Sequence, residues 1–341
     1  MSVTSQLKDK NSPLRQFFLE YENKAGMNEC LAALQASKPT KPLGYKPASN
    51  AVYAFIGTAT DYLIRYNAGG NKLIFEDTIA CSALKSIISY NKPLPDIIYD
   101  YEIPFLQPGE YYMNSLSEIG MQYIDGRPAS DFKAIYSATA LAVMDGVYRS
   151  TFLPKLFYKS IPSNEIERIG KMKDDELEIE TKKYLDQIGK SLFEKYYNES
   201  LGGELYAQDI SELLNIFQEA VKYPENELFN AQFVVFNQSL NNEKLVGGVD
   251  FDCVIKHNNR MILTDIKTTI KPLKHEHLYQ IISYALLQDE KWDNFKFTDI
   301  GIYHSRSGSF RFIPIEKIID NTLHGFNSVN QARDIFLRFL S

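Results

Sequence analysis

Three aspartates and one lysine interrupt apolar segments that otherwise have the composition of β-strands. Asp250 and Asp252 lie in the run Leu245 to Ile255, while Asp265 and Lys267 close a second apolar run that begins at Met261. Strand side chains alternate between the two faces of a sheet, so Asp265 and Lys267, two residues apart, are expected on one face. Such a pair can form an ion pair or act together on a bound group.

The segment between the two runs contains Asn258 and Asn259, which are typical of a tight hairpin turn. A two-residue turn there predicts two opposing pairs, Asp252 with Asp265 and Asp250 with Lys267. All four charged side chains would then share one face of the sheet. The side chains expected on the other face are Phe251, Cys253 and Ile266.

Neighbouring carboxylates repel one another unless a cation lies between them, so this cluster predicts a metal site with oxygen ligands. We expect Mg²⁺, for which Mn²⁺ could substitute, bound by carboxylate oxygens of this cluster, to which Asp252 also belongs. Lys267 could orient or deprotonate a water molecule, or stabilise charge that develops on a phosphate.

Three short motifs follow one another here: Gly247-Gly248-Val249-Asp250, Asp265-Ile266-Lys267-Thr268, and Gln280 with Tyr284 four residues later. Their order and spacing resemble the PD-(D/E)XK nuclease superfamily, in particular its RecB-type branch, which carries G-x-x-D, D-x-K-T and Q-x-x-x-Y. The resemblance implies that Asp250 and Asp265 hold the metal and that Lys267 is catalytic. It also implies that Thr268, Gln280 and Tyr284 lie along the DNA path or support the site.

A helix is expected over Ala51 to Tyr66, and it carries Gly57-Thr58-Ala59-Thr60-Asp61. This segment resembles a RecB-type helix with the pattern G-T-x-x-H or G-T-x-x-D, whose last residue reaches the metal. Asp61 would then be another metal ligand. The alternative is a surface aspartate that pairs with Arg65 one helical turn later.

The remaining pattern predicts an α/β (α+β) protein with a restriction-endonuclease-like central mixed sheet, flanked by helices and interrupted by a large helical insertion. Residues 1–72 would contain the N-terminal helices and the first helix of the nuclease core. Residues 73–226 would form the insertion, which could bind a protein partner, and residues 227–341 the catalytic core with a C-terminal helix. The other expected strands are Ala231 to Asn237, Asp299 to His304 and Ser309 to Pro314.

A short positive loop follows the second strand of the hairpin, and Lys271 and Lys274 are expected to meet the phosphate backbone. We interpret His275 and His277, at the start of the next helix, as surface residues. His304 and Arg306 flank a turn, where contact with substrate is one option and plain exposure is the other.

Composition limits the function classes. The net charge is −6, so any nucleic-acid contact depends on a local basic patch. Three widely separated cysteines cannot supply the four thiolates of an iron-sulfur cluster, and we expect none. Without an apolar signal segment or a membrane-spanning run, we expect a cytoplasmic protein that does not bind membranes.

The leading hypothesis is a Mg²⁺-dependent deoxyribonuclease in phage defence, mobile-element biology or DNA repair. One alternative is a nuclease-like protein that binds nucleic acid or a partner without cutting. Another is an unrelated fold in which Asp265 and Lys267 form a structural ion pair. The choices between exonuclease and endonuclease, DNA and RNA, and one metal ion and two stay open.

Overall fold

A computed structural model describes residues 3–36, 50–67, 231, 233–236, 240–248, 251–269, 271–291, 293 and 295–341, with single positions between 138 and 179. The chain forms two compact units: the first joins residues 1–41, 68–71 and 223–341, and the second contains residues 42–67 and 72–222. Most of the expected helical insertion lies outside the described residues. The division at residues 72 and 226 stays a prediction.

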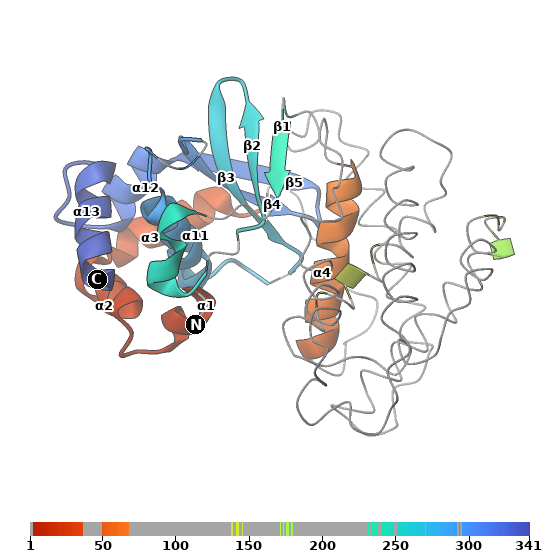
Figure 1. Ribbon diagram of the computed structural model, residues 1–341, viewed down its shortest axis with the longest axis horizontal. Helices are drawn as coiled ribbons and strands as arrows, with labels where there is room; N and C mark the ends of the chain where they lie inside the picture. The colour runs from red at the N-terminus through yellow and green to blue at the C-terminus, as the bar shows by residue number, and fades with distance from the viewer. Residues whose placement is uncertain are drawn as a thin grey trace, which may run out of the picture. The chain divides into compact units, whose positions relative to one another are not determined.

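A five-stranded mixed sheet forms the centre of the first unit (Figure 1). Its strands follow one another in sequence order: β1 (Phe233–Phe236), β2 (Cys253–His257), β3 (Arg260–Lys267), β4 (Asp299–His304) and β5 (Ser309–Pro314). Neighbouring strands are antiparallel except β3 and β4, which are parallel and are connected through helix α11 (His275–Leu287). A parallel pair requires such a crossover, and it brings the carboxyl ends of β3 and β4 together.

The β2–β3 hairpin has the predicted register. Asn258 and Asn259 adopt positive φ angles of 47° and 63°, as a two-residue turn of the hairpin type requires. Cys253 pairs with Thr264, and continuing the same register places Asp252 opposite Asp265. The turn therefore determines which acidic residues meet.

The first strand of the hairpin is shorter than predicted. The chain from Asn241 to Val246 forms a 3₁₀ helix, η3, and Gly247 and Gly248 follow with φ angles of 77° and 123°. Glycine adopts such angles at little cost, whereas other residues are strained there. The two glycines therefore turn the chain before β2, which begins only at Cys253.

Phe251 does not follow the predicted alternation, which placed it on the face opposite the charged cluster. Because it precedes β2, its side chain is free of the strand periodicity, and it is fully buried in the core cluster that includes Val254 and Leu263. Its ring lies 6.3 Å from that of Tyr284 and 6.1 Å from that of Phe297. Phe251 thus packs on the helix-covered side of the sheet and not on the side expected for it.

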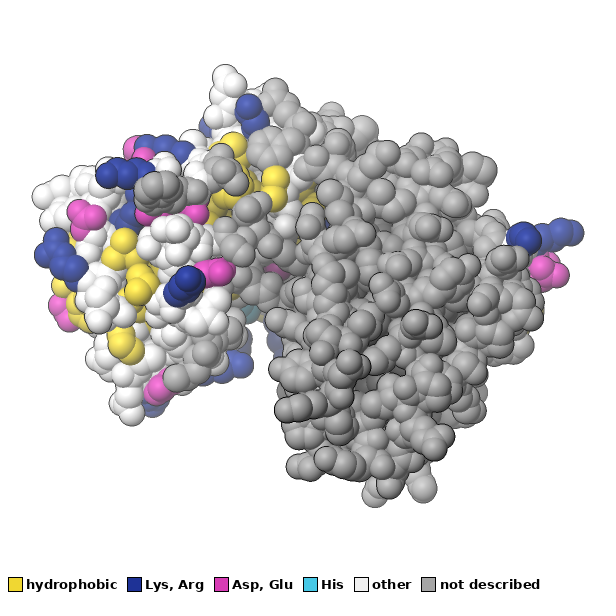
Figure 2. All heavy atoms as spheres, in the orientation of Figure 1, with side chains coloured by type: hydrophobic (Ala, Val, Ile, Leu, Met, Phe, Trp, Pro, Cys, Tyr) yellow, Lys and Arg dark blue, Asp and Glu magenta, His cyan; other side chains and the backbone are white. Residues whose placement is uncertain are grey.

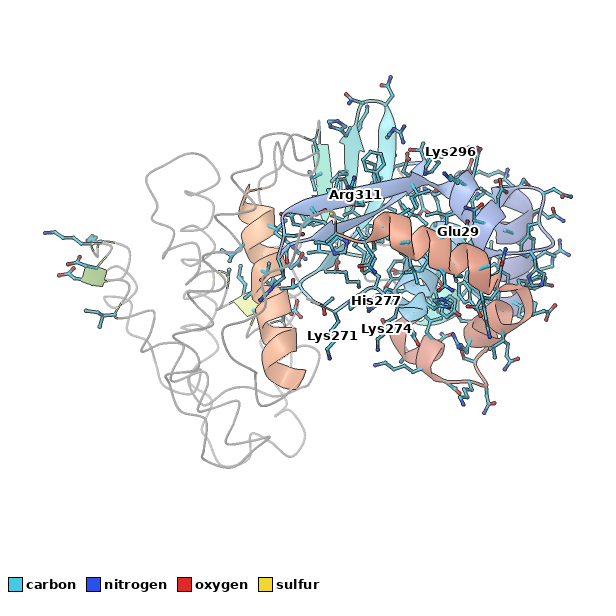
Figure 3. The ribbon with its side chains drawn as sticks, turned by 180° about the vertical axis from the view of Figure 1, so that it is seen from behind. Glu29, Lys271, Lys274, His277, Lys296 and Arg311 are labelled. Carbon is cyan, nitrogen blue, oxygen red and sulfur yellow. The ribbon has the colours of Figure 1, made fainter. Side chains whose placement is uncertain are left out.

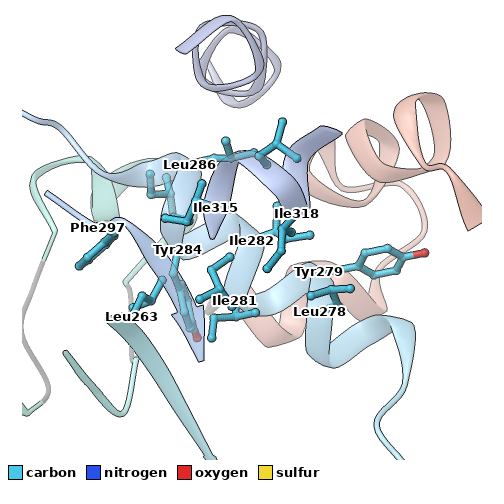
Figure 4. Close-up of a cluster of buried hydrophobic side chains, with 14 of the residues drawn as sticks. Leu263, Leu278, Tyr279, Ile281, Ile282, Tyr284, Leu286, Phe297, Ile315 and Ile318 are labelled. Carbon is cyan, nitrogen blue, oxygen red and sulfur yellow. The ribbon is translucent and has the colours of Figure 1, made fainter. Parts of the chain in front are cut away.

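Among the described residues of this unit, six helices surround the core. They are α1 (Val3–Lys8), α2 (Pro13–Tyr21), α3 (Lys24–Leu34), α11, α12 (Ile315–Thr322) and α13 (Val329–Leu340). Of these, α1 and α12 were missing from the sequence-based prediction. The apolar face of α11, including Leu278, Ile281 and Ile282, packs on the sheet and on Ile315 and Ile318 (Figure 4). Burial of these apolar side chains stabilises the unit.

The N-terminal helices are also joined to α11 by a partly buried polar network. One oxygen of Glu22 lies 2.6 Å from the Tyr279 hydroxyl and 2.8 Å from His275 Nδ1, and His275 Nε2 lies 2.9 Å from Asn28 Oδ1. The guanidinium of Arg15 stacks over the Tyr279 ring at 5.0 Å. His275 is therefore engaged in this contact and is not the plain surface residue that we expected.

The described residues thus form a mixed α+β fold, in which helices flank a five-stranded sheet. The second unit contributes α4 (Asn50–Asn67), which matches the helix expected around Asp61.

Candidate functional site

The carboxyl end of β3 carries a buried ion pair. Lys267 Nζ lies 2.5 Å from Asp265 Oδ2, and the two side chains are 16% and 5% exposed. Period-two alternation places both side chains on the face that Leu263 shares, so this part of the prediction is confirmed. A charged pair held this far from water lies in a region where electrostatic interactions are strong.

Asp252 completes the described part of the cluster. Its Oδ2 accepts a hydrogen bond of 2.5 Å from the backbone N–H of Ile266, which holds it across from Asp265. Burial alone would lower the pKa of the Lys267 ammonium group, but the carboxylates of Asp265 and Asp252 outweigh burial and raise it. Lys267 therefore remains protonated at neutral pH.

The structure does not place two of the predicted metal ligands relative to this cluster. Asp250 lies outside the described residues. Asp61 belongs to the second compact unit and forms an ion pair with Arg65, whose guanidinium stacks over the Tyr62 ring at 5.0 Å. This is the pairing that the alternative interpretation of Asp61 predicted, and a role for Asp61 toward a metal stays a prediction.

Gln280 and Tyr284 lie on α11, one turn apart. The Gln280 amide nitrogen donates to the Tyr284 hydroxyl at 2.9 Å, and Tyr284 is almost fully buried whereas Gln280 is half-buried. Tyr284 therefore acts partly as a core residue that fixes Gln280. Gln280 is the more exposed member of the pair.

Two histidines that the sequence analysis treated as peripheral lie beside the cluster. His304 pairs in register with Lys267 on the adjacent parallel strand, is 4% exposed, and places Nε2 2.8 Å from the Leu34 carbonyl of α3. It is therefore a buried residue and not one beside an exposed turn. Burial chiefly lowers the pKa of its imidazole, with the charge of Lys267 adding to that effect and the Leu34 bond and Asp265 opposing it.

His277 approaches the same cluster from the first turn of α11. Its Nδ1 accepts from the backbone N–H of Lys274 at 3.1 Å, and burial followed by the charge of Lys267 lowers its pKa. The side chains of Lys274 and His277 lie together in Figure 3. Lys271 and Lys274 are exposed, as a contact with phosphate would need.

The β4–β5 turn also contacts the site. The backbone N–H of Ser305 donates to the Lys267 carbonyl at 3.1 Å, and the Ser305 hydroxyl lies 3.0 Å from the Thr268 hydroxyl. Arg306, next to it, is 6% exposed and so is not an exposed turn residue. The serine's role had no sequence signal, because it depends on a contact across 37 residues.

Asp252 and Asp265 fit Mg²⁺ by donor type, since protein Mg²⁺ sites commonly use one or two carboxylates together with water and substrate phosphate. Within the described ranges, no group of three His, Cys, Asp or Glu side chains is placed to hold a metal ion. A site with three protein ligands would need another residue, and Asp250 stays the candidate for it.

Comparisons of the chain with protein-family models, with curated proteins and with solved structures found no match. None of the helices in the described part of the chain combines the length and apolar character needed to cross a bilayer.

Proposed function

We propose that the chain is a metal-dependent nuclease that hydrolyses phosphodiester bonds of DNA. The main observation behind the proposal is that two carboxylates lie near one ammonium group. Lys267 pairs with Asp265, and Asp252 lies beside them. This leaves one negative charge in excess among these three groups, in a buried place, and a bound cation would offset it.

The positions of the three motifs add support. The G-x-x-D segment ends just before β2, the D-x-K-T segment ends β3, and Gln280 and Tyr284 lie on α11, which packs on the same side of the sheet. The RecB-type resemblance expects the three motifs on a strand, a strand and a helix; the second and third lie on such elements, whereas the first precedes β2. The proposal therefore rests on chemistry and on order, without a matched relative.

The charged side chains near the end of β3 each have a role in this proposal. Asp265 and Asp252, with Asp250, would hold Mg²⁺, which supplies a Lewis acid for the phosphate and a nucleophilic water. Lys267, which pairs with Asp265, would present its ammonium group to the phosphate and stabilise the charge that develops there in the transition state. Lys271 and Lys274, both exposed, would contact neighbouring phosphates.

The distribution of surface charge indicates that DNA would be attracted to basic groups near the site and not to the surface as a whole. Basic and acidic side chains are interspersed over the described part of the face in Figure 2. With a net charge of −6, binding would depend on the few basic groups near the site and would weaken as salt rises.

The test is cleavage of linear, circular and single-stranded DNA with Mg²⁺ and with EDTA. Wild-type protein should cut one or more of these only with Mg²⁺, and Asp265→Asn should lose that activity. The matched control is Asp299→Asn, which alters a similarly buried aspartate with a basic partner on the neighbouring strand. Cleavage that survives Asp265→Asn would remove the assignment.

The runner-up is a nuclease-like protein that binds DNA without cutting. Asp265 and Asp252 each already have a partner, as a cluster that is stable without a metal would. DNA binding without cleavage, combined with no calorimetric signal for Mg²⁺ or Mn²⁺, would favour it.

A further inference from the structure

The turn between β4 and β5 is polar and yet buried. Ser305, Arg306 and Ser307 are 0%, 6% and 7% exposed. Surface turns normally leave such side chains in water, so a buried serine in one needs a specific partner. Ser305 has one at the end of β3, beside the ion pair.

Ser305 attaches to the D-x-K-T segment at two points. Its backbone N–H donates to the carbonyl of Lys267 at 3.1 Å, and its hydroxyl oxygen lies 3.0 Å from the hydroxyl oxygen of Thr268. These bonds continue the contact between β3 and β4 beyond the last ladder pair, Lys267 with His304. The backbone that carries Lys267 is thereby fixed on its carboxyl side.

The burial of the two hydroxyls differs, and this decides the direction of the hydrogen bond. Ser305 is fully buried, so its hydrogen needs an acceptor inside the protein, and among the described residues that acceptor is Thr268 Oγ1. Thr268 is half-buried. Once its oxygen accepts from Ser305, its own hydrogen can point outward, and a hydroxyl that accepts one hydrogen bond becomes a stronger donor.

We propose that Ser305 is a positioning residue, which orients the Thr268 hydroxyl so that it donates a hydrogen bond to a phosphate oxygen of DNA next to Lys267. The inference rests on the proposed nuclease function and deepens it. A hydroxyl donor beside an ammonium group suits a phosphate, because hydrogen bonds to charged oxygens are shorter and stronger than neutral ones. Ser305 itself would touch no substrate.

The test measures the Kd of a short fluorescent DNA duplex and of a single strand, with Ca²⁺ in place of Mg²⁺ so that the DNA stays intact. KM and kcat are then measured with Mg²⁺. Thr268→Val should weaken binding about 10-fold and Ser305→Ala about 3- to 5-fold. The double variant should match Thr268→Val within about 2-fold, because both changes remove the same interaction.

Two controls separate positioning from general damage. Ser307→Ala changes a buried serine of the same turn, whose hydroxyl donates to the His304 carbonyl at 3.3 Å, and it should bind DNA within about 2-fold of wild type. Thr268→Ser keeps the hydroxyl and should bind as wild type does. Thr268→Val alters a half-buried residue, so the hydrogen bond between Ser305 and Thr268 can be removed even where Ser305→Ala fails to fold.

The inference is overturned when wild type binds DNA but Ser305→Ala binds equally well. It is also overturned when the increase in Kd of the double variant equals the product of the increases in the two single variants. Wild-type protein that neither binds nor cuts DNA would instead remove the proposed function, and the inference with it.

Discussion

The two ends of the β3–β4 pair each hold a buried aspartate with a basic partner, but their charge balance differs. At one end Asp299, 3% exposed, accepts from Arg260 at 2.6 Å, so one acid meets one base. At the other end Asp265 and Asp252 share Lys267. The first arrangement is complete as a structural ion pair. Counted over Asp265, Asp252 and Lys267 alone, the second has one more carboxylate than ammonium group, an imbalance that costs stability unless a further cation offsets it.

The largest expected effect is on cleavage by Lys267 variants. Lys267→Met should reduce kcat by about 10²- to 10³-fold, because it removes a positive charge that faces the phosphate in the transition state. Lys267→Arg should restore only part of the rate, since the guanidinium has a different shape. Single-turnover cleavage measures this, with Arg260→Met as the control at the other end. Equal losses in Lys267→Met and Arg260→Met would erase the distinction between the two ends.

Mg²⁺ should stabilise one end only. At a concentration about 100 times its Kd, the ion should raise the free energy of unfolding of the wild type by about 2–3 kcal/mol. Urea denaturation with and without Mg²⁺ measures the increment. It should vanish in Asp265→Asn and persist in Asp299→Asn. An increment that persists in Asp265→Asn places the ion elsewhere.

Loss of the complete pair should have a modest structural effect. Arg260→Met leaves the Asp299 carboxylate, 3% exposed, without its cation, although Thr298 still donates to it. The free energy of unfolding should therefore fall by about 1–2 kcal/mol, and the response to Mg²⁺ should stay unchanged. Part of that loss would come from the contact of Arg260 with the Phe312 ring, 5.2 Å away. Thermal unfolding in parallel with cleavage tests both statements. A decrease of several kcal/mol in the free energy of unfolding would show that the Arg260–Asp299 pair stabilises the fold more than we infer.

The smallest effect concerns acid. The folded-state pKa of His304 lies below its ordinary value of 6.5, so the unfolded chain takes up a proton first and stability falls as pH drops below about 6.5. His304→Gln keeps a donor for the Leu34 carbonyl but does not titrate. Its free energy of unfolding should therefore decline less between pH 7 and pH 5, while His277 contributes equally to both proteins. If the free energy of unfolding declined with falling pH equally in wild type and His304→Gln, this prediction would be contradicted.

Local signals predicted much of the hairpin and its neighbours. The Asn258–Asn259 turn determined the register, and alternation placed Asp265 with Lys267. Strands β4 and β5 begin and end where the apolar runs do. In these cases the structural choice depends on residues close in sequence, through turn geometry and period-two patterning.

What escaped prediction depends on contacts between distant residues or on special backbone angles. The positive φ angles of Gly247 and Gly248 shorten β2, although its apolar composition continues upstream. His304 is buried because α3 covers it, and Ser305 is engaged because Thr268 lies across the sheet. A histidine or serine beside a turn has the same local sequence signal whether or not a distant helix packs over it.

The bond between the Leu34 carbonyl and His304 joins residues that are separated by 270 positions in the chain. During synthesis, β4 and its histidine emerge long after α3, so the growing chain can form the hairpin with Asp265 and Lys267 well before the strand that lies beside them exists. Because such distant contacts are slow to form, the site should be among the last parts of the protein to mature. A nascent chain would then carry its acidic cluster without the groups that later enclose it.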